Sequence, residues 1–256
     1  MIEFSQVQKK YGKNIVLNKV NFTIERGETV AIVGFSGAGK SVCLRHMIRL
    51  TGPDHGSILI DETPLERLNR MEMRQMRSRF GVLFQGAALL QWMNLYDNVA
   101  LALRERTEFS ETEIKKRVEQ CLDWVGLLEA ADRIPSEVSG GMQKRAGLAR
   151  AIVMNPEILL YDEPTSGLDP VTSRKIDRLI AKTNREQGAT SVVVTHDLIS
   201  AMDIATRIMM LHEGQVVEYT TPENFVYSKV AVVQQFLEAQ HIPASFGSGD
   251  DQDEKK

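Results

Sequence analysis

The sequence is short of cysteine and carries almost no net charge. Its two cysteines, Cys43 and Cys121, both lie in apolar helical patterns, which suits a reducing compartment rather than a disulfide scaffold. The 31 Lys and Arg against 34 Asp and Glu leave a net charge of −3. The electrostatic footprint of a protein that wraps nucleic acid is therefore missing, and we expect no nucleic-acid partner.

Long apolar runs are missing as well. No stretch approaches the roughly 20 apolar residues that a membrane-spanning helix needs. The first four residues, Met-Ile-Glu-Phe, do not begin the basic, apolar and small-residue order of a signal peptide. We therefore expect a cytosolic chain, and any membrane role has to come through a partner.

What the sequence does contain is an alternation of strand-like and helical segments, which predicts an α/β fold. Several of the strand-like runs are almost entirely apolar, as expected of strands buried on both faces of a mostly parallel sheet. The expected strands lie at 28–33, 57–60, 80–84, 157–161, 190–194 and 207–211. The expected helices begin near Lys40, Met71, Asn94, Glu111, Gly140, Val171 and Leu198.

One segment, about 86–155, breaks this alternation because it contains no convincing strand and at least three helical patterns. Ser110 and Glu113 form a capping-box pattern at the start of one of these helices. We predict a single domain over 1–244, with this helical subdomain inserted in its α/β core. A short amphipathic helix is expected near 232–237, and the polar tail 245–256 is expected to be disordered.

A phosphate-binding loop is predicted at 34–41, where the residues fit the pattern G-x-x-x-x-G-K-[ST] between an apolar strand and a helix expected at 41–50. Glycines there let backbone N–H groups turn toward phosphate oxygens. Lys40 is expected to reach the β- and γ-phosphates, and the Ser41 hydroxyl is placed to bind Mg²⁺. The expected nucleotide contacts are Gly34, Phe35, Ser36, Gly37, Ala38, Gly39, Lys40, Ser41 and Val42.

Two adjacent carboxylates, Asp162 and Glu163, follow the apolar run 158–161. At the end of a strand, Asp162 can hold Mg²⁺ while Glu163 polarises the attacking water. The same pair could instead cap the following helix. Because the phosphate loop is also present, we predict an ATPase that uses ATP and Mg²⁺.

At this point the residues resemble the ABC-transporter ATPase family over nearly the whole chain. The segment Val138–Met142 is similar to the signature loop of the family, and 166–169 is similar to its D-loop. Gln85 resembles the Q-loop glutamine and His196 the switch histidine. Tyr11 stands where the family stacks an aromatic ring on adenine, and we expect that role, although N-terminal aromatic residues are more often part of the core.

The resemblance implies the P-loop ABC ATPase fold, with an N-terminal antiparallel β subdomain. It also implies a head-to-tail homodimer that encloses two ATP molecules. Each nucleotide would then be held by the Lys40 loop of one chain and the signature loop of the other. The resemblance adds Ser139, Gly140, Gly141 and Asp169 to the nucleotide contacts, Gln85 to the Mg²⁺ ligands, and His196 and Gln85 to the catalytic residues.

One residue departs from the family pattern. Met142 stands where most members have glutamine, and a methionine cannot donate the hydrogen bond of that amide. Ser139 and the two following glycines, which contact phosphate in the family, match the family pattern. We therefore expect activity to survive.

Further segments are similar to the ATPases of bacterial Mla/Mce-type phospholipid transporters (maintenance of lipid asymmetry, mammalian cell entry). These segments are 84–89, 93–99 and the variant signature 139–142. The resemblance implies a permease in the inner membrane, with the ATPase at its cytoplasmic face. It also implies a periplasmic Mce-type lipid-binding protein and, in some members, a small cytosolic regulatory subunit. The apolar stretch 89–93 could receive the permease or fold back into the core of the subdomain.

Three other functions stay open at this stage. The chain could be the ATPase of an importer for a small polar solute, such as an amino acid or a metal chelate. It could be a soluble ABC ATPase without a transporter, although no second cassette, coiled coil or basic arm is visible. A scaffold that uses ATP only to dimerise is disfavoured by the presence of Glu163 and His196.

Overall fold

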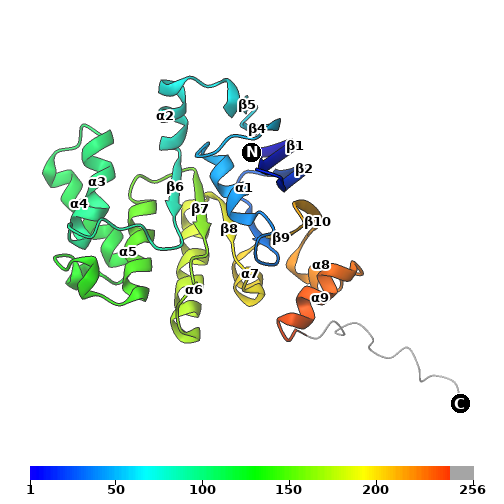
Figure 1. Ribbon diagram of the computed structural model, residues 1–256. Coiled ribbons are helices and arrows are strands. Elements are labelled where there is room, and N and C mark those ends of the chain that lie inside the picture. Colours follow the sequence, from blue (N-terminus) through cyan, green and yellow to red (C-terminus); the bar gives the residue numbers. More distant parts are fainter. Residues whose placement is uncertain (243–256) are drawn as a thin grey trace, which may run out of the picture.

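The computed structural model describes residues 1–242 and has the predicted α/β fold, built on two sheets (Figure 1). The larger sheet has the order β10-β9-β3-β8-β7-β6, and all of its strands are parallel except the edge strand β10. The predicted acidic tail 245–256 lies outside the described residues. The strands of this sheet are β3 (Thr29–Val33), β6 (Phe80–Leu83), β7 (Ile158–Asp162), β8 (Thr190–Val194), β9 (Arg207–His212) and β10 (Gln215–Thr220).

The parallel strands are nearly all buried, which matches the unbroken apolar runs in the sequence. Their carboxyl ends meet at one edge of the sheet, where the loops after β3, β6, β7 and β8 begin. Helices connect the strands in the manner of a doubly wound fold. These helices are α1 (Lys40–Met47), α2 (Arg70–Ser78), α6 (Pro170–Gln187) and α7 (Leu198–Ile204).

The helix after the phosphate loop is shorter than predicted. It ends at Met47 rather than continuing to Leu50, because Arg49 adopts a left-handed backbone with φ 50°. The Leu50 N–H then donates to the carbonyl of Arg45 at 2.8 Å, which closes the last turn.

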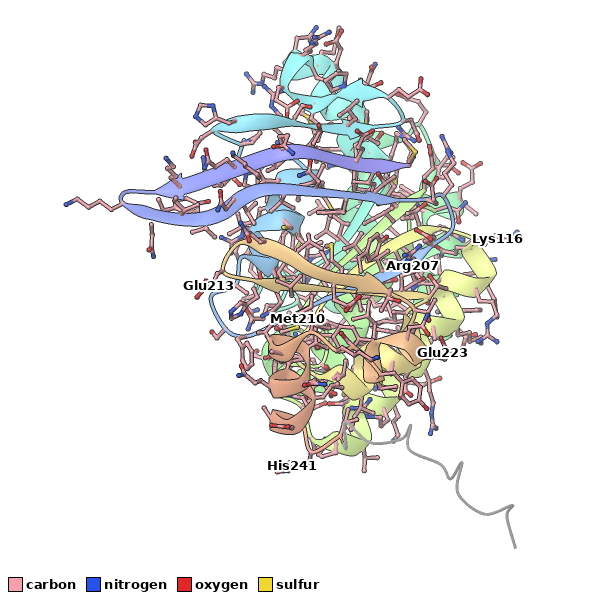
Figure 2. The ribbon with its side chains drawn as sticks, turned by 90° about the vertical axis from the view of Figure 1, so that its right-hand side faces the viewer. Lys116, Arg207, Met210, Glu213, Glu223 and His241 are labelled. Atoms are coloured by element: carbon pink, nitrogen blue, oxygen red, sulfur yellow. The ribbon has the colours of Figure 1, made fainter. Side chains whose placement is uncertain are left out.

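The smaller sheet is antiparallel, with the order β2-β1-β4-β5, and supplies the predicted N-terminal β subdomain. Its strands are β1 (Ile2–Tyr11), β2 (Asn14–Ile24), β4 (His55–Ile60) and β5 (Thr63–Pro64). Figure 2 shows β1 and β2 running above the β9–β10 hairpin, whose tip carries Glu213. Two hydrogen bonds join these layers: Asn18 N–H donates to Gly214 O at 2.8 Å, and the Tyr219 hydroxyl donates to Thr23 O at 2.8 Å.

Between β6 and β7 the described chain contains only helices and turns. These are α3 (Leu95–Arg106), α4 (Glu111–Trp124), α5 (Gly140–Ile152) and two 3-10 turns, η2 (Leu128–Ala130) and η3 (Pro135–Glu137). They lie together to one side of the sheet (Figure 1). Both hydrogen bonds of the predicted capping box between Ser110 and Glu113 are present, so that expectation is confirmed. The domain boundaries 1–244 and 86–155 stay a prediction.

The chain ends, within the described residues, on two short helices beside β9 and β10. These are α8 (Pro222–Val226) and α9 (Ala231–Ala239). Helix α9 was expected from its apolar pattern, and its buried face is formed by Val233, Phe236 and Leu237. Over residues 1–242, no helix is both long and apolar enough to span a bilayer.

Candidate nucleotide-binding and hydrolytic site

The phosphate loop leaves the end of β3 and turns sharply into α1. Gly34 adopts φ 142°, and a Cβ there would collide with the backbone oxygen of Leu211. Gly39 adopts φ 101° immediately before the helix, where a Cβ would lie 2.7 Å from the Val16 carbonyl oxygen. Both positions therefore require glycine, which explains two of the three glycines of the motif.

The N-terminus of α1 is open to an anion. Within residues 1–242, no side chain caps this helix, and its first turn contains no acidic residue. Its first N–H groups lack intrahelical partners and carry the positive end of the helix dipole. By contrast, Ser139 and Asp169 cap the helices that follow them. Phosphate oxygens are the ligands that such an uncapped, glycine-led N-terminus suits.

Lys40 is held inside the loop. Its ammonium group donates to the carbonyl oxygens of Gly34 at 2.7 Å and Phe35 at 3.0 Å. Burial lowers the pKa of Lys40, while the nearby carboxylates Glu163 and Asp162 act in the opposite direction. The cation thus lies between the phosphate loop and the two acids, where it can neutralise phosphate charge.

The Ser41 hydroxyl donates to Oδ1 of Asp162 at 2.8 Å, which joins the start of α1 to the end of β7. Hydroxyl and carboxylate oxygens are the donors that Mg²⁺ prefers in sites of this kind. Two of the three predicted Mg²⁺ ligands, Ser41 and Asp162, are therefore adjacent although they lie far apart in the sequence. Their chemistry fits a magnesium ion that also binds phosphate.

Glu163 follows β7 in a left-handed conformation, with φ 49°. Few residues other than glycine adopt this conformation, and it is often found at functional sites. The Glu163 N–H donates to Val194 O at 2.9 Å, which ties it to the end of β8. Its carboxylate lies 2.8 Å from Nδ1 of His196, so the predicted base and the switch histidine are in direct contact.

Lys40, Ser41 and Glu163 line a cavity of about 390 Å³. Asp162 contacts Ser41 and His196 contacts Glu163, but neither is among the lining residues. Tyr11 is 47% exposed and lines this cavity, as required for stacking on an adenine ring, and Gln85 and Glu163 line it as well. Val16, at the start of β2, also lines the cavity and was missed from the sequence because an apolar residue in a strand carries no site signal. The lining residues are Tyr11, Val16, Ser36, Gly37, Ala38, Gly39, Lys40, Ser41, Val42, Gln85 and Glu163.

Phe35 does not line the cavity with its ring. The ring packs edge-on against Phe236 of α9, with centroids 5.3 Å apart, and against His212 at 6.2 Å. Only the backbone carbonyl of Phe35 faces Lys40. The predicted nucleotide contact of Phe35 is therefore restricted to its backbone, and its side chain anchors the loop to the C-terminal helix.

The loop after β6 is held by two cations from α5. Lys144 donates to the Gln85 carbonyl and, at 3.1 Å, to the Glu163 carbonyl. Arg150 donates to the carbonyls of Ala87 at 2.6 Å and Ala88 at 2.7 Å. Burial lowers the pKa of both cations. The sequence pattern did not indicate either contact, because both depend on how α5 packs against the sheet edge.

The predicted signature loop forms the start of α5 and does not line this cavity. The Ser139 hydroxyl accepts the Met142 N–H at 3.3 Å and so caps α5. Met142 packs against the apolar core of the helices, and Gln143 donates to the carbonyls of Pro135 and Val138. Ser139, Gly140 and Gly141 are absent from the cavity lining, as is Asp169, which caps α6 through the Thr172 N–H at 3.0 Å.

The apolar stretch 89–93 is partly buried in the helical core and partly exposed, so each of the two interpretations of the sequence fits a part of it. Leu89 is buried in the helical core, which agrees with the fold-back alternative. Trp92 is 77% exposed and lies within the loop that joins β6 to α3. An indole exposed to this extent is the part of the stretch that a partner could cover.

Comparison with known proteins agrees with this geometry. The family model described as ABC transporter matches residues 17–166, more than half of the chain. The "Probable ribonucleotide transport ATP-binding protein mkl" of Mycobacterium tuberculosis is 42% identical over 253 residues, which are 99% of this chain and 70% of that protein. The "Methionine import ATP-binding protein MetN 1" of Pseudomonas putida is 40% identical over 93% of this chain and 72% of its own length.

The fold also matches a solved structure. The ATP-binding cassette MJ0796, in a dimeric post-hydrolysis state bound to ADP and Pi, superposes with a TM-score of 0.80 at 36% identity. The match covers 87% of this chain and 99% of that one. That protein holds the hydrolysis products of ATP in a fold of the same kind.

Proposed function

This chain belongs to the ABC transporter family, and from that premise we propose that it drives phospholipid transport between the inner and outer membranes of a bacterium. The chain is the ATP-hydrolysing subunit of an ABC transporter, and it works with ATP and Mg²⁺. The observation that carries the hydrolytic mechanism is the meeting of Lys40, Ser41, Asp162, Glu163 and His196 at one sheet edge.

The residues divide the chemistry between them. The start of α1 and Lys40 bind the phosphates, while Ser41, Asp162 and Gln85 would hold the magnesium ion. Glu163 accepts a proton from the attacking water as that water bonds to the γ-phosphorus, and the bond from this phosphorus to the β-phosphate oxygen breaks, which releases ADP and phosphate. His196 orients the Glu163 carboxylate and contacts the γ-phosphate. The bound Mg²⁺ supplies charge neutralisation at the phosphates.

The site of one chain is incomplete, and we assign the missing half to a second copy. Gly140 and Gly141 begin α5, and their N–H groups can bind an anion because the cap Ser139 accepts the Met142 N–H instead. Ser139, Gly140 and Gly141 do not line the cavity of their own chain. In a head-to-tail homodimer they contact the γ-phosphate held by the partner. Asp169 borders the same interface. Dimeric cassettes of this fold are known, as in MJ0796.

The phospholipid assignment is supported by sequence segments rather than by the site. The segments 84–89, 93–99 and 139–142 are similar to Mla/Mce-type ATPases. We therefore propose a permease in the inner membrane as the direct partner, with the exposed Trp92 on the contact surface, and a position at its cytoplasmic face. A periplasmic Mce-type lipid-binding protein and a small cytosolic regulatory subunit complete the assembly.

The second candidate is an importer ATPase for a small polar solute. It is favoured by the names of two relatives, which refer to ribonucleotide transport and methionine import. The two candidates share the ATPase mechanism and differ only in the membrane partners. The ATPase fold alone therefore does not separate them.

The test is an affinity purification of the chain from detergent-solubilised native membranes, with proteins and lipids identified by mass spectrometry. The phospholipid proposal predicts a multi-helix permease, a single-span periplasmic protein and enriched phospholipid. A permease recovered with a polar-solute binding protein and no enriched lipid would overturn the substrate class and leave the ATPase mechanism intact. A Trp92→Ala variant, which should recover less permease, shows whether that surface is the contact.

A further inference from the structure

Lys144 is a buried cation on α5 that contacts both catalytic loops. Its side chain is 6% exposed, and it lies five residues after the helix cap Ser139. The ammonium group donates to the backbone carbonyls of Gln85 and Glu163. Burying an ammonium group is unfavourable unless it is hydrogen-bonded, so an apolar side chain would be more stable here if residue 144 only filled space.

Both carbonyls belong to backbone segments with unusual conformations. Glu163 has φ 49°, and Ala87 and Ala88, just after Gln85, have φ 58° and 49°. Such conformations persist only where surrounding contacts hold them. Arg150 already fixes Ala87 and Ala88 from the same helix. Lys144 instead holds the two residues whose side chains line the nucleotide cavity, Gln85 and Glu163.

We propose that Lys144 is a positioning residue for hydrolysis, which sets the spacing of Gln85 and Glu163 across the nucleotide cavity and ties both to α5. This inference rests on the proposed roles of Gln85 and Glu163. It also implies that α5 contributes residues to both nucleotide sites of the proposed dimer. The cap of this helix, Ser139, contacts the nucleotide of the partner in the proposed dimer, and Lys144 contacts the base and the Mg²⁺ ligand of its own chain.

The test compares Lys144→Met, which keeps an unbranched side chain of nearly the same length without its donors, with Lys144→Gln, which keeps two N–H donors. Lys115→Met, at an exposed lysine on α4, is the matched control. For Lys144→Met we expect kcat to fall by about tenfold to a hundredfold, as for a misplaced catalytic group. The KM for ATP should change by less than about threefold, because the phosphate loop is intact.

Two further readouts separate positioning from folding. The Mg²⁺ concentration for half-maximal rate should rise in Lys144→Met, since Gln85 shifts. Lys144→Gln should recover part of the lost kcat and of the Mg²⁺ response. Lys115→Met should match the wild-type chain in every assay.

The proposal is overturned if Lys144→Met keeps a kcat within about twofold of wild type. It is also overturned if both Lys144 variants lose activity and melting temperature equally, because Lys144 would then serve only the fold. Glu163→Gln is measured in parallel. If Glu163→Gln still turns over normally, the proposed site roles fail and this inference fails with them. If Glu163→Gln is inactive while Lys144→Met is unaffected, only the inference on Lys144 is lost.

Discussion

Nδ1 of His196 lies 2.8 Å from Oε2 of Glu163, although the two residues are 33 positions apart in the sequence. The contact follows from the sheet, because β7 and β8 are adjacent and parallel, with Asp162 paired to Val194. The residues just beyond the two strands must then meet at the same edge. A histidine at this distance can hold the carboxylate in one orientation, which is what a general base requires.

Replacing the switch histidine should slow chemistry more than binding. For His196→Ala we expect kcat to fall by about a hundredfold, because Glu163 loses its orienting partner. The Kd for ATP should change little, since the phosphate loop and Tyr11 are unaltered. Phosphate release and fluorescent-nucleotide titration measure the two effects. His55→Ala, at an exposed histidine on β4, should behave as wild type. Equal losses in both variants would contradict the assignment.

Loss of the phosphate-loop lysine should impair binding as well as turnover. Lys40→Ala removes the buried ammonium between the loop carbonyls and the two carboxylates. We expect ATP affinity to fall by at least about tenfold, because phosphate charge is no longer neutralised. Isothermal titration with ATP and Mg²⁺ measures this. An unchanged affinity in Lys40→Ala would remove Lys40 from the phosphate site.

Mixing two inactive variants tests whether each site uses both chains. Lys40→Ala and Ser139→Ala should each be inactive alone as homodimers. In a mixed dimer, one site carries both changes and the other carries neither, so phosphate release should recover. If Ser139 instead served the nucleotide of its own chain, both sites of the mixed dimer would be damaged and no recovery would follow.

Helix α6 carries a buried carboxyl group, Asp177, whose effect on the free energy of unfolding depends on pH. Asp177 pairs with Arg174 at 2.9 Å and accepts the Ser200 hydroxyl at 2.8 Å, while its Oδ1 has no partner within residues 1–242. Burial raises the pKa of Asp177 to about 6 from an ordinary value of 3.8. The folded chain therefore holds this proton at pH values where the unfolded chain has released it.

It follows that Asp177 lowers the free energy of unfolding progressively as pH rises from about 4 to about 6. Above pH 6 this decrease in the free energy of unfolding is complete and stays constant. Asp177→Asn has no proton to release and should be more stable than wild type at pH 7, by about 3 kcal/mol at most. The difference should vanish near pH 4. Urea unfolding at several pH values measures this, with Asp123→Asn, at an exposed aspartate on α4 away from this cluster, as control. A uniform loss of stability at every pH would mean that the ion pair with Arg174 dominates.

The parallel strands could be predicted from the sequence because their apolar runs are continuous and their ends carry motif residues. The bounds of β1 and β2 could not be predicted, because the pairing of these two strands is irregular. The pairing shifts between Phe4 and Val7, and Gln6 adopts φ 51°, so the alternation of apolar residues is broken by a bulge. Lys19, in β2, is displaced in the same way, with φ 51°.

Site residues could be predicted from the sequence where they lie within one short motif whose residue types indicate their role. The phosphate loop and the Asp162–Glu163 pair are local patterns, and strand order alone brings them together. The contacts of Lys144 and Arg150 are not local, since they require α5 to pack across the loop after β6. Phe35 shows the converse case: a residue inside a motif turns its ring toward α9, because Phe236 offers an apolar partner.

The most direct test of the account is the Glu163→Gln variant, measured for turnover and for mass in solution with ATP and Mg²⁺. The amide cannot accept the proton of the attacking water, so kcat should fall by about a hundredfold or more while ATP still binds. Without hydrolysis, the ATP-bound sandwich should persist, and light scattering should show twice the 28.8 kDa of one chain. A variant that hydrolyses ATP at the wild-type rate and stays monomeric would contradict both the base and the composite site.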